Sequence, residues 1–179
     1  SIFMNNKKLL FEYLVFRLDE WNKQMNNTNK IQLSKLRLQK ILFLVCACNA
    51  TNENRRLLNV FDKFYALPYG PVEMDIYEAM KKEGSFQNIY FIGNDCEYNK
   101  FDESIFNELS YEERKWVDDA IQKFKSENKK YLTMPVFDLV EITHQWTIWK
   151  ISMDIAQLLG RKQVKMYADE ICNSLIKSF

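Results

Sequence analysis

Apolar residues near the N-terminus recur at intervals of three and four, and charged residues fill most of the positions between them. This periodicity predicts an amphipathic helix. Its apolar positions are Leu10, Tyr13, Leu14, Leu18 and Trp21. The stretch 22–30 is polar and aperiodic, which predicts a loop. A second helix is expected over 33–49, and because its second half is apolar on all sides we expect it to be central and buried.

The middle of the chain predicts a turn, a third helix and a hairpin. Residues 61–67 form either a short strand or an irregular segment before Pro68-Tyr69-Gly70-Pro71. Because the fixed φ of proline suits a first helical turn, a helix is expected from Pro71 to about Lys82, ended by Gly84. The aromatic-rich runs 88–92 and 96–101 are separated by Gly93-Asn94-Asp95. This arrangement predicts a small β-hairpin.

Helix-start signals dominate the last third of the sequence. Ser110 and Glu113 form an S-x-x-E capping box, which predicts a helix opening there. A shorter helix is expected from Pro135 to about Ile142. After Gly160, apolar positions from 164 to 179 predict a C-terminal helix within 161–179. We expect it to pack on the core of its own domain, the alternative being a coiled-coil seam that faces a partner.

Together these elements predict a mainly α fold with a minor β-hairpin, a compact helical bundle around the central buried helix. The length of 179 residues fits a single domain over 1–179. The longest apolar run, 41–48, is far shorter than the ~20 residues that span a bilayer. We therefore expect no membrane helix. The four cysteines are expected to be reduced and structural, which favours a cytoplasmic protein.

Composition removes several classes of chemistry. The 25 Lys+Arg and 24 Asp+Glu leave a net charge of +1, which disfavours a dedicated nucleic-acid binder. A nucleic-acid contact would need dispersed basic residues to share one surface, namely Lys35, Arg37, Lys40, Arg55 and Arg56. A single His excludes multi-histidine metal sites, and four Gly cannot supply a dinucleotide or P-loop motif. We expect no metal and no cofactor.

His144 is the one position through which histidine-based catalysis would have to pass. A catalytic interpretation makes it a general base oriented by Asp138 or Glu141, but no nucleophile motif accompanies it. The structural interpretation places it at a helix end, bonded to a carbonyl and packed beside Trp146 and Trp149. We favour the structural interpretation and expect a protein that is not an enzyme.

Three stretches, taken in order, resemble the motifs of a known family. Leu36-Arg37-Leu38-Gln39-Lys40-Ile41-Leu42-Phe43 resembles K-L-Q-K-L-L-aromatic. Ala66-Leu67-Pro68-Tyr69-Gly70-Pro71-Val72, followed by Ile76-Tyr77, resembles A-W-x-Y-G-P-V…V-Y. The stretch 139–149 resembles L-x-x-L-T-H-x-x-x-P-W. Over about 33–149 the chain is thereby similar to the Panacea domain, the SocA-like antitoxin family. It departs at Leu67, where the family has an aromatic residue, and at Ile148, where it has proline.

The resemblance implies a helical bacterial or phage antitoxin that binds its toxin protein directly, the toxin being encoded by the adjacent gene. It also implies that some members present the toxin to a protease, so a protease adaptor is one alternative and a nucleic-acid-binding transcriptional autoregulator is another. No catalytic residue carries over. The motif residues that do, as structural or partner-binding positions, are Leu38, Gln39, Lys40, Tyr69, Gly70, Pro71, Val72, Thr143, His144 and Trp149.

The residues themselves suggest what this motif set does. Gly70 and Pro71 provide the backbone freedom and the fixed φ that a sharp turn needs. Gln39 adjoins the buried half of the second helix, so we expect it to satisfy backbone groups in that turn or near Thr143 and His144. The motif would then be mainly an internal polar clasp, and the toxin would bind elsewhere.

Overall fold

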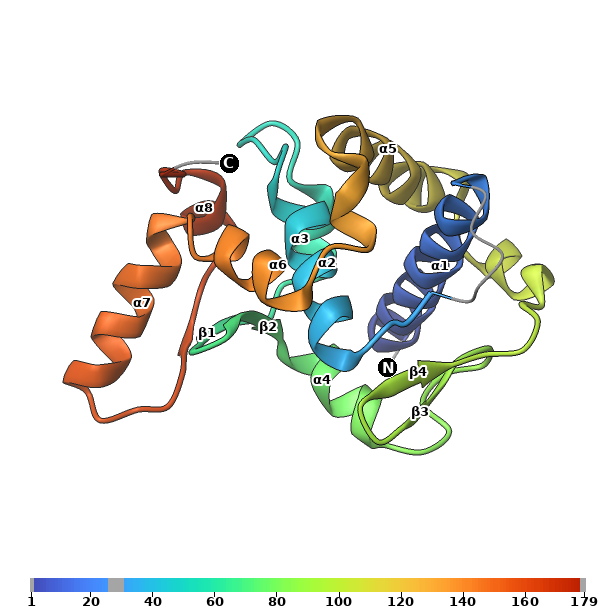
Figure 1. Ribbon diagram of the computed structural model, residues 1–179, viewed down its shortest axis with the longest axis horizontal. Helices are drawn as coiled ribbons and strands as arrows, with labels where there is room; N and C mark the ends of the chain where they lie inside the picture. Colours follow the sequence, from blue (N-terminus) through green and yellow to red (C-terminus); the bar gives the residue numbers. More distant parts are fainter. Residues whose placement is uncertain (1, 26–30, 178–179) are drawn as a thin grey trace. The chain divides into compact units, whose positions relative to one another are not determined.

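The computed structural model describes residues 2–25 and 31–177 (Figure 1). Helices dominate and the strands are short, which confirms the expected mainly α fold with a minor β part. The chain divides into two compact units, residues 1–35 with 76–133 and residues 36–75 with 134–179. They are called the first and the second unit below. None of the described helices is long and apolar enough to cross a membrane.

The first unit is built on α1 (Ile2–Gln24) and α5 (Tyr111–Glu127), which pack against each other. Trp21 of α1 meets Phe124 of α5 edge to face, with the ring centroids 6.1 Å apart. At the start of α5, Ser110 and Glu113 exchange the two hydrogen bonds of a capping box. Both helices agree with the predictions, except that α1 extends to Gln24, into the stretch expected to be a loop. The remainder of that loop, 26–30, lies outside the described residues.

The predicted hairpin is also part of the first unit. Strands β3 (Tyr90–Ile92) and β4 (Asp95–Glu97) pair antiparallel, and Gly93 turns between them with a φ of 59°. The hairpin is followed by the 3-10 helix η1 (Glu103–Glu108), and a second, η2 (Lys129–Leu132), follows α5. These positions confirm the hairpin that the Gly93-Asn94-Asp95 sequence predicts.

The second unit contains almost all of α2 (Lys35–Ala47), which begins at the boundary between the units. Every residue of α2 from 38 to 47 is buried, which confirms the expectation of a buried helix. Phe43 contacts Phe64 and Trp146 with ring centroids 5.3 and 5.4 Å away, both nearly perpendicular. These aromatic contacts join α2 to the sheet and to the segment before α7.

The sheet of the second unit has the order β2-β1-β5, and both pairings are antiparallel. Its strands are β1 (Phe64–Leu67), β2 (Gly70–Glu73) and β5 (Val164–Lys165). The helices that accompany it are α3 (Arg56–Val60), α6 (Val136–Thr143), α7 (Thr147–Leu158) and α8 (Ala168–Cys172). The sheet resolves the alternative at 61–67 in favour of a strand, and α6 confirms the helix expected near Pro135.

The prediction of a helix starting at Pro71 is wrong. Pro71 lies in β2, opposite Ala66, and the helix α4 (Met74–Lys81) begins three residues later. Proline cannot donate to a strand ladder, but β2 is an edge strand of its sheet, where a missing donor is tolerated. The fixed φ of Pro71 suits both structures, and pairing with β1 decided between them.

The prediction of a C-terminal helix within 161–179 is also wrong. Residues 164–165 form β5 on β1, and α8 covers only 168–172. The apolar positions there serve a strand, a short helix and a tail whose Ile176 bridges to Trp146. In addition, the 12-residue helix α7, which was not predicted, occupies 147–158. Tertiary pairing with β1 overrode the helical spacing of these apolar residues.

Candidate functional site

The motif residues all lie in the second unit and come from three places: α2, the β1–β2 turn with β2, and the segment from the end of α6 into α7. Nine of the ten are buried or half-buried, and Leu38 is completely enclosed. Tyr69 alone is strongly exposed, at 61%, where its ring meets that of Phe137. The structure therefore brings the predicted site residues together, largely in the interior.

Gln39 connects α2 to β2. Its side-chain amide donates to the Glu73 carbonyl at 3.2 Å, and its side-chain oxygen accepts from the Glu73 N–H at 2.9 Å. Both groups of Gln39 thus bond the backbone of one residue in β2, the strand that contains Gly70 and Pro71. These two bonds confirm the expectation that Gln39 satisfies buried backbone groups beside this turn.

Lys40 is completely buried, and its Nζ donates a hydrogen bond to the Pro71 carbonyl. Burial disfavours the charged ammonium and lowers the pKa of Lys40 to about 7. The burial of Lys40 also argues against the basic surface that nucleic-acid binding would need. A side chain with no exposed surface cannot contribute to a basic patch with Arg55 and Arg56.

Gly70 allows the turn to approach α6 closely. Its φ is +99°, and a Cβ placed on it would lie 2.5 Å from Thr143 Oγ1 and 3.3 Å from Lys40 Nζ. Thr143 is fully buried, and its hydroxyl donates to the Val140 carbonyl at 2.7 Å. Glycine is required here twice, for its positive φ and for the missing side chain.

His144 caps the end of α6 and stacks on Trp149, with the two ring centroids 3.6 Å apart. The indole Nε1 of Trp149 donates to the Leu67 carbonyl at 2.8 Å. Burial is the main cause that lowers the pKa of His144, with a nearby Glu141 and a hydrogen bond to the Pro68 backbone opposing it. His144 thus ends a helix and packs on Trp149, as the structural interpretation predicts.

In the described part of the chain, His144 lacks the carboxylate partner that the catalytic interpretation gives it. The buried Nε2 of His144 has no hydrogen-bond partner among the residues that the structure describes, so neither Asp138 nor Glu141 orients it. A general base needs a proton donor within hydrogen-bond reach. The ring is instead covered on one face by Trp149.

One group of neighbouring carboxylates was not predicted from the sequence. The side chains of Asp62, Glu73 and Asp75 place oxygen atoms within 4.8 Å of one another. The two oxygens of buried Glu73 accept from the backbone N–H groups of Lys63 and Asp75, and Lys63 Nζ lies 3.3 Å from Asp75. These contacts stabilise the carboxylates of Glu73 and Asp75. Only the β1–β2 pairing brings the three acids together, so no local sequence signal marks them.

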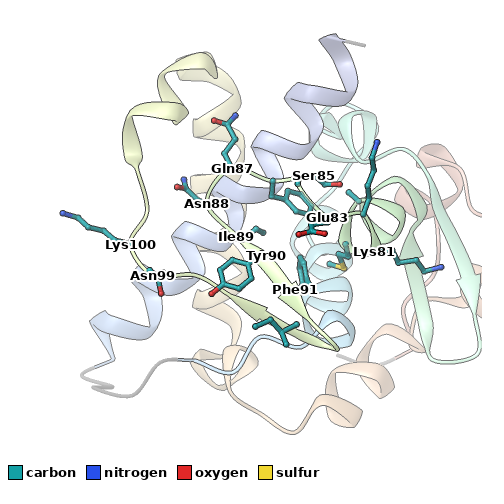
Figure 2. A pocket seen from close by; sticks show the side chains of 16 residues that line it. Lys81, Glu83, Ser85, Gln87, Asn88, Ile89, Tyr90, Phe91, Asn99 and Lys100 are labelled. Atoms are coloured by element: carbon teal, nitrogen blue, oxygen red, sulfur yellow. The ribbon is translucent and has the colours of Figure 1, made fainter.

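A cavity of about 680 Å³ lies in the first unit, apart from the motif residues. It is lined by the segment 79–92 together with Asn99 and Lys100, as Figure 2 shows. A second cavity of about 410 Å³ in the same unit is lined by parts of α1, η1 and α5. Concave surfaces depend on tertiary packing, and the sequence offers no pattern that would have predicted them.

A known protein family matches this chain. Residues 38–150 match the family described as antitoxin SocA-like, Panacea domain, and this is more than half of the chain. The chain belongs to the SocA-like Panacea domain family. No curated protein and no solved structure matches it.

The Panacea match contains every motif residue, from Leu38 to Trp149, and it begins close to where the resemblance begins in the sequence. The match also spans the hairpin and the larger cavity, although neither contains a motif residue. The Panacea motif of this chain is thus the clasp formed by Gln39, Lys40, Gly70 and their partners. Among the motif residues only Tyr69 is strongly exposed, while His144 and Trp149 are half-buried.

Proposed function

We propose that this Panacea domain protein is an antitoxin that neutralises a toxin protein by direct, stoichiometric binding, without catalytic turnover. The observation that carries the proposal is the family match over 38–150. The toxin is expected to be the product of the adjacent gene.

The contacts of the motif residues support a binding role for other parts of the surface. The polar side-chain groups of Gln39 and Lys40 form hydrogen bonds with the backbone of Glu73 and Pro71. One face of the His144 ring stacks on Trp149. Groups used inside the fold are not available to a substrate or a partner. Binding a protein then falls to exposed residues outside the clasp.

Exposed apolar side chains on α7 and on β3 give two candidate surfaces of this kind. On α7, Ile151, Ile155 and Leu158 are spaced along one side of the helix and are 51%, 39% and 85% exposed. Apolar side chains gathered on a surface are typical of protein-binding sites. Several basic residues are paired with acids, such as Lys150 with Asp154 at 2.8 Å, which favours a protein partner over nucleic acid.

Co-expression tests the proposal. The adjacent gene's product is placed under an inducible promoter unrelated to its own, with and without this protein. Neutralisation predicts restored growth and a complex of fixed stoichiometry in size-exclusion chromatography with light scattering. The foreign promoter prevents an autoregulator from restoring growth by repression. Loss of growth despite this protein, with no complex, would refute the antitoxin function.

A titration separates binding from turnover. Purified toxin is assayed against increasing amounts of this protein, and stoichiometric binding predicts an end point at a fixed molar ratio. His144→Phe, which keeps an aromatic ring against Trp149 but removes both ring nitrogens, should neutralise as well as the natural protein. Full neutralisation by trace amounts, abolished in His144→Phe, would instead indicate an enzyme.

A further inference from the structure

Strand β3 is an open edge in the part of the chain that the structure describes. The hairpin has the order β3-β4, and the far side of β4 is already taken. There the Cys96 N–H donates to the Leu33 carbonyl at 2.8 Å, and the Lys35 N–H donates to the Asn94 carbonyl at 2.7 Å. The outer side of β3 has no such neighbour among the described residues.

The peptide groups of Phe91 point toward this open edge. Phe91 is opposite Cys96, whose N–H points away from β3 toward Leu33. In an antiparallel pair of this kind the peptide groups of both residues point away from each other. The N–H and C=O of Phe91 therefore face outward, and neither has a hydrogen-bond partner within the described ranges.

The residues on either side of Phe91 make the edge apolar. Tyr90 is 48% exposed and Ile92 is 64% exposed. Exposed edge strands usually carry lysine, proline or a bulge, which discourages pairing with another chain. The β3 edge, defined as residues 90–92, is short, which is a further protection of this kind, but it carries no lysine, proline or bulge. It combines free peptide groups with apolar side chains, which is what an added strand requires.

The larger cavity adjoins this edge. All three residues of β3 line it, and Figure 2 shows Tyr90 and Phe91 around the hollow with Ser85 from the preceding loop. The Oγ atom of Ser85 is buried and has no hydrogen-bond partner among the described residues. A volume of about 680 Å³ is enough for several side chains, so a strand paired with Phe91 has room for its own residues.

Charge on the cavity wall indicates what kind of segment fits. Lys81, Lys82 and Lys100 line it, against the single carboxylate of Glu83. Lys81 Nζ already lies 4.0 Å from the Glu78 carboxylate and 4.1 Å from the centre of the Tyr77 ring, so the excess charge comes from Lys82 and Lys100. In addition, Lys35 Nζ lies 5.8 Å from the centre of the Phe91 ring. The excess of ammonium groups complements an occupant that carries a carboxylate.

We propose that the β3 edge and its cavity bind an extended segment of the partner protein, which adds to the hairpin as a third strand. The segment pairs with the peptide groups of Phe91 and carries apolar side chains and at least one carboxylate. This inference rests on the proposed function and names the surface that performs it. The α7 stripe is the rival surface. It offers apolar area without directional hydrogen bonds, so an extended segment is better matched by β3.

Amide hydrogen exchange on the purified complex with the adjacent gene's product tests the pairing. In the free protein the Phe91 amide should exchange fast, and in the complex it should slow by roughly tenfold or more. The Cys96 amide is the internal reference, since its hydrogen bond to Leu33 lies on the far side of β4 and should persist in the complex. An unchanged Phe91 amide in a stable complex would overturn the inference.

Two matched variants test the surface. Ile92→Asp places a carboxylate on the β3 edge and should weaken binding roughly tenfold or more. Leu158→Asp is the control on α7, where the natural side chain is 85% exposed, and should bind as the natural protein does. Both positions are exposed, so circular dichroism should show unchanged folding.

The outcomes separate the two proposals. If a complex forms but Leu158→Asp weakens it and Ile92→Asp does not, the partner binds α7 and the inference is wrong while the antitoxin function stands. If both substitutions leave binding unchanged, the inference is also wrong. If no complex forms with any version of the protein, the proposed function fails, and the inference fails with it.

Discussion

Replacing Gly70 by alanine should destabilise the second unit strongly. The backbone cost of an L-residue at positive φ is about 1–2 kcal/mol. The new Cβ would lie 2.5 Å from Thr143 Oγ1, which is far inside normal contact distance. Thr143 is fully buried and bonded to Val140, so it cannot move without losing that hydrogen bond. Overpacking of this kind costs roughly 1–3 kcal/mol. We therefore expect Gly70→Ala to lower the free energy of unfolding by about 2–5 kcal/mol.

Gly160→Ala is the matched control. Gly160 also has a positive φ, 64°, but a Cβ there would meet nothing within 4 Å. Only the backbone cost remains, so this variant should lose about 1–2 kcal/mol. Urea unfolding followed by tryptophan fluorescence measures both variants, and the difference between them reports the steric contacts of the new Cβ, of which the contact with Thr143 is the shortest.

A double variant tests the cause directly. Thr143→Ala removes the atom that the new Cβ would meet, so Gly70→Ala with Thr143→Ala should lose about 1–2 kcal/mol less than the sum of the two single variants. If the two losses add without coupling, or if Gly70→Ala costs no more than Gly160→Ala, the close approach of the turn to α6 is not what requires glycine at position 70.

Other contacts lead to further predictions. Because the pKa of Lys40 is about 7 when folded and 10.5 when unfolded, the unfolded chain binds more protons in between, and stability should rise with pH above 7. Between pH 7.5 and pH 9 the free energy of unfolding should therefore rise by about 1–2 kcal/mol more in the natural protein than in Lys40→Met. The same rise in both proteins would contradict the lowered pKa of Lys40. Gln39→Ala leaves the buried Glu73 N–H and C=O without their partner, so it should lower the urea midpoint by the equivalent of about 2–3 kcal/mol; a loss below that of an exposed Gln157→Ala would argue against the clasp. Ser110→Ala removes the capping box with Glu113 and should cost about 1 kcal/mol in thermal unfolding, which Ser110→Asp should largely restore.

The antitoxin proposal and the clasp fit together physically. The polar groups of Gln39 and Lys40 join α2 to Glu73 and Pro71 of β2, and Gly70 lets the β1–β2 turn lie close to Thr143 of α6. A fold stabilised from inside leaves its outer residues free to differ between partners. The β3 edge is such an outer surface, and a strand added there would be recognised chiefly through peptide groups.

Local signals in the sequence were sufficient for the elements that depend on neighbouring residues. The periodicity of α1, the apolar run of α2, the Ser110 capping box and the Gly93-Asn94 turn all act within a few residues. A capping box or a tight turn satisfies its own backbone groups, so its sequence is enough to predict it.

The tertiary structure decided the elements whose partners are distant in the chain. Pro71 suits a helix start as well as an edge strand, and only pairing with Ala66 selects the strand. Val164 has the spacing of a helical residue. It nevertheless forms part of β5, because it pairs with Ala66 of β1, about a hundred residues earlier in the chain. The same holds for the site. The sequence determined which residues form the motif and the hairpin, whereas the close approach of Gly70 to Thr143 and the pairing of β4 with residues 33–35, which leaves β3 as the open edge, exist only because packing brings distant backbone segments together. Periodicity records which side of an element is apolar, but it does not record what that side will meet.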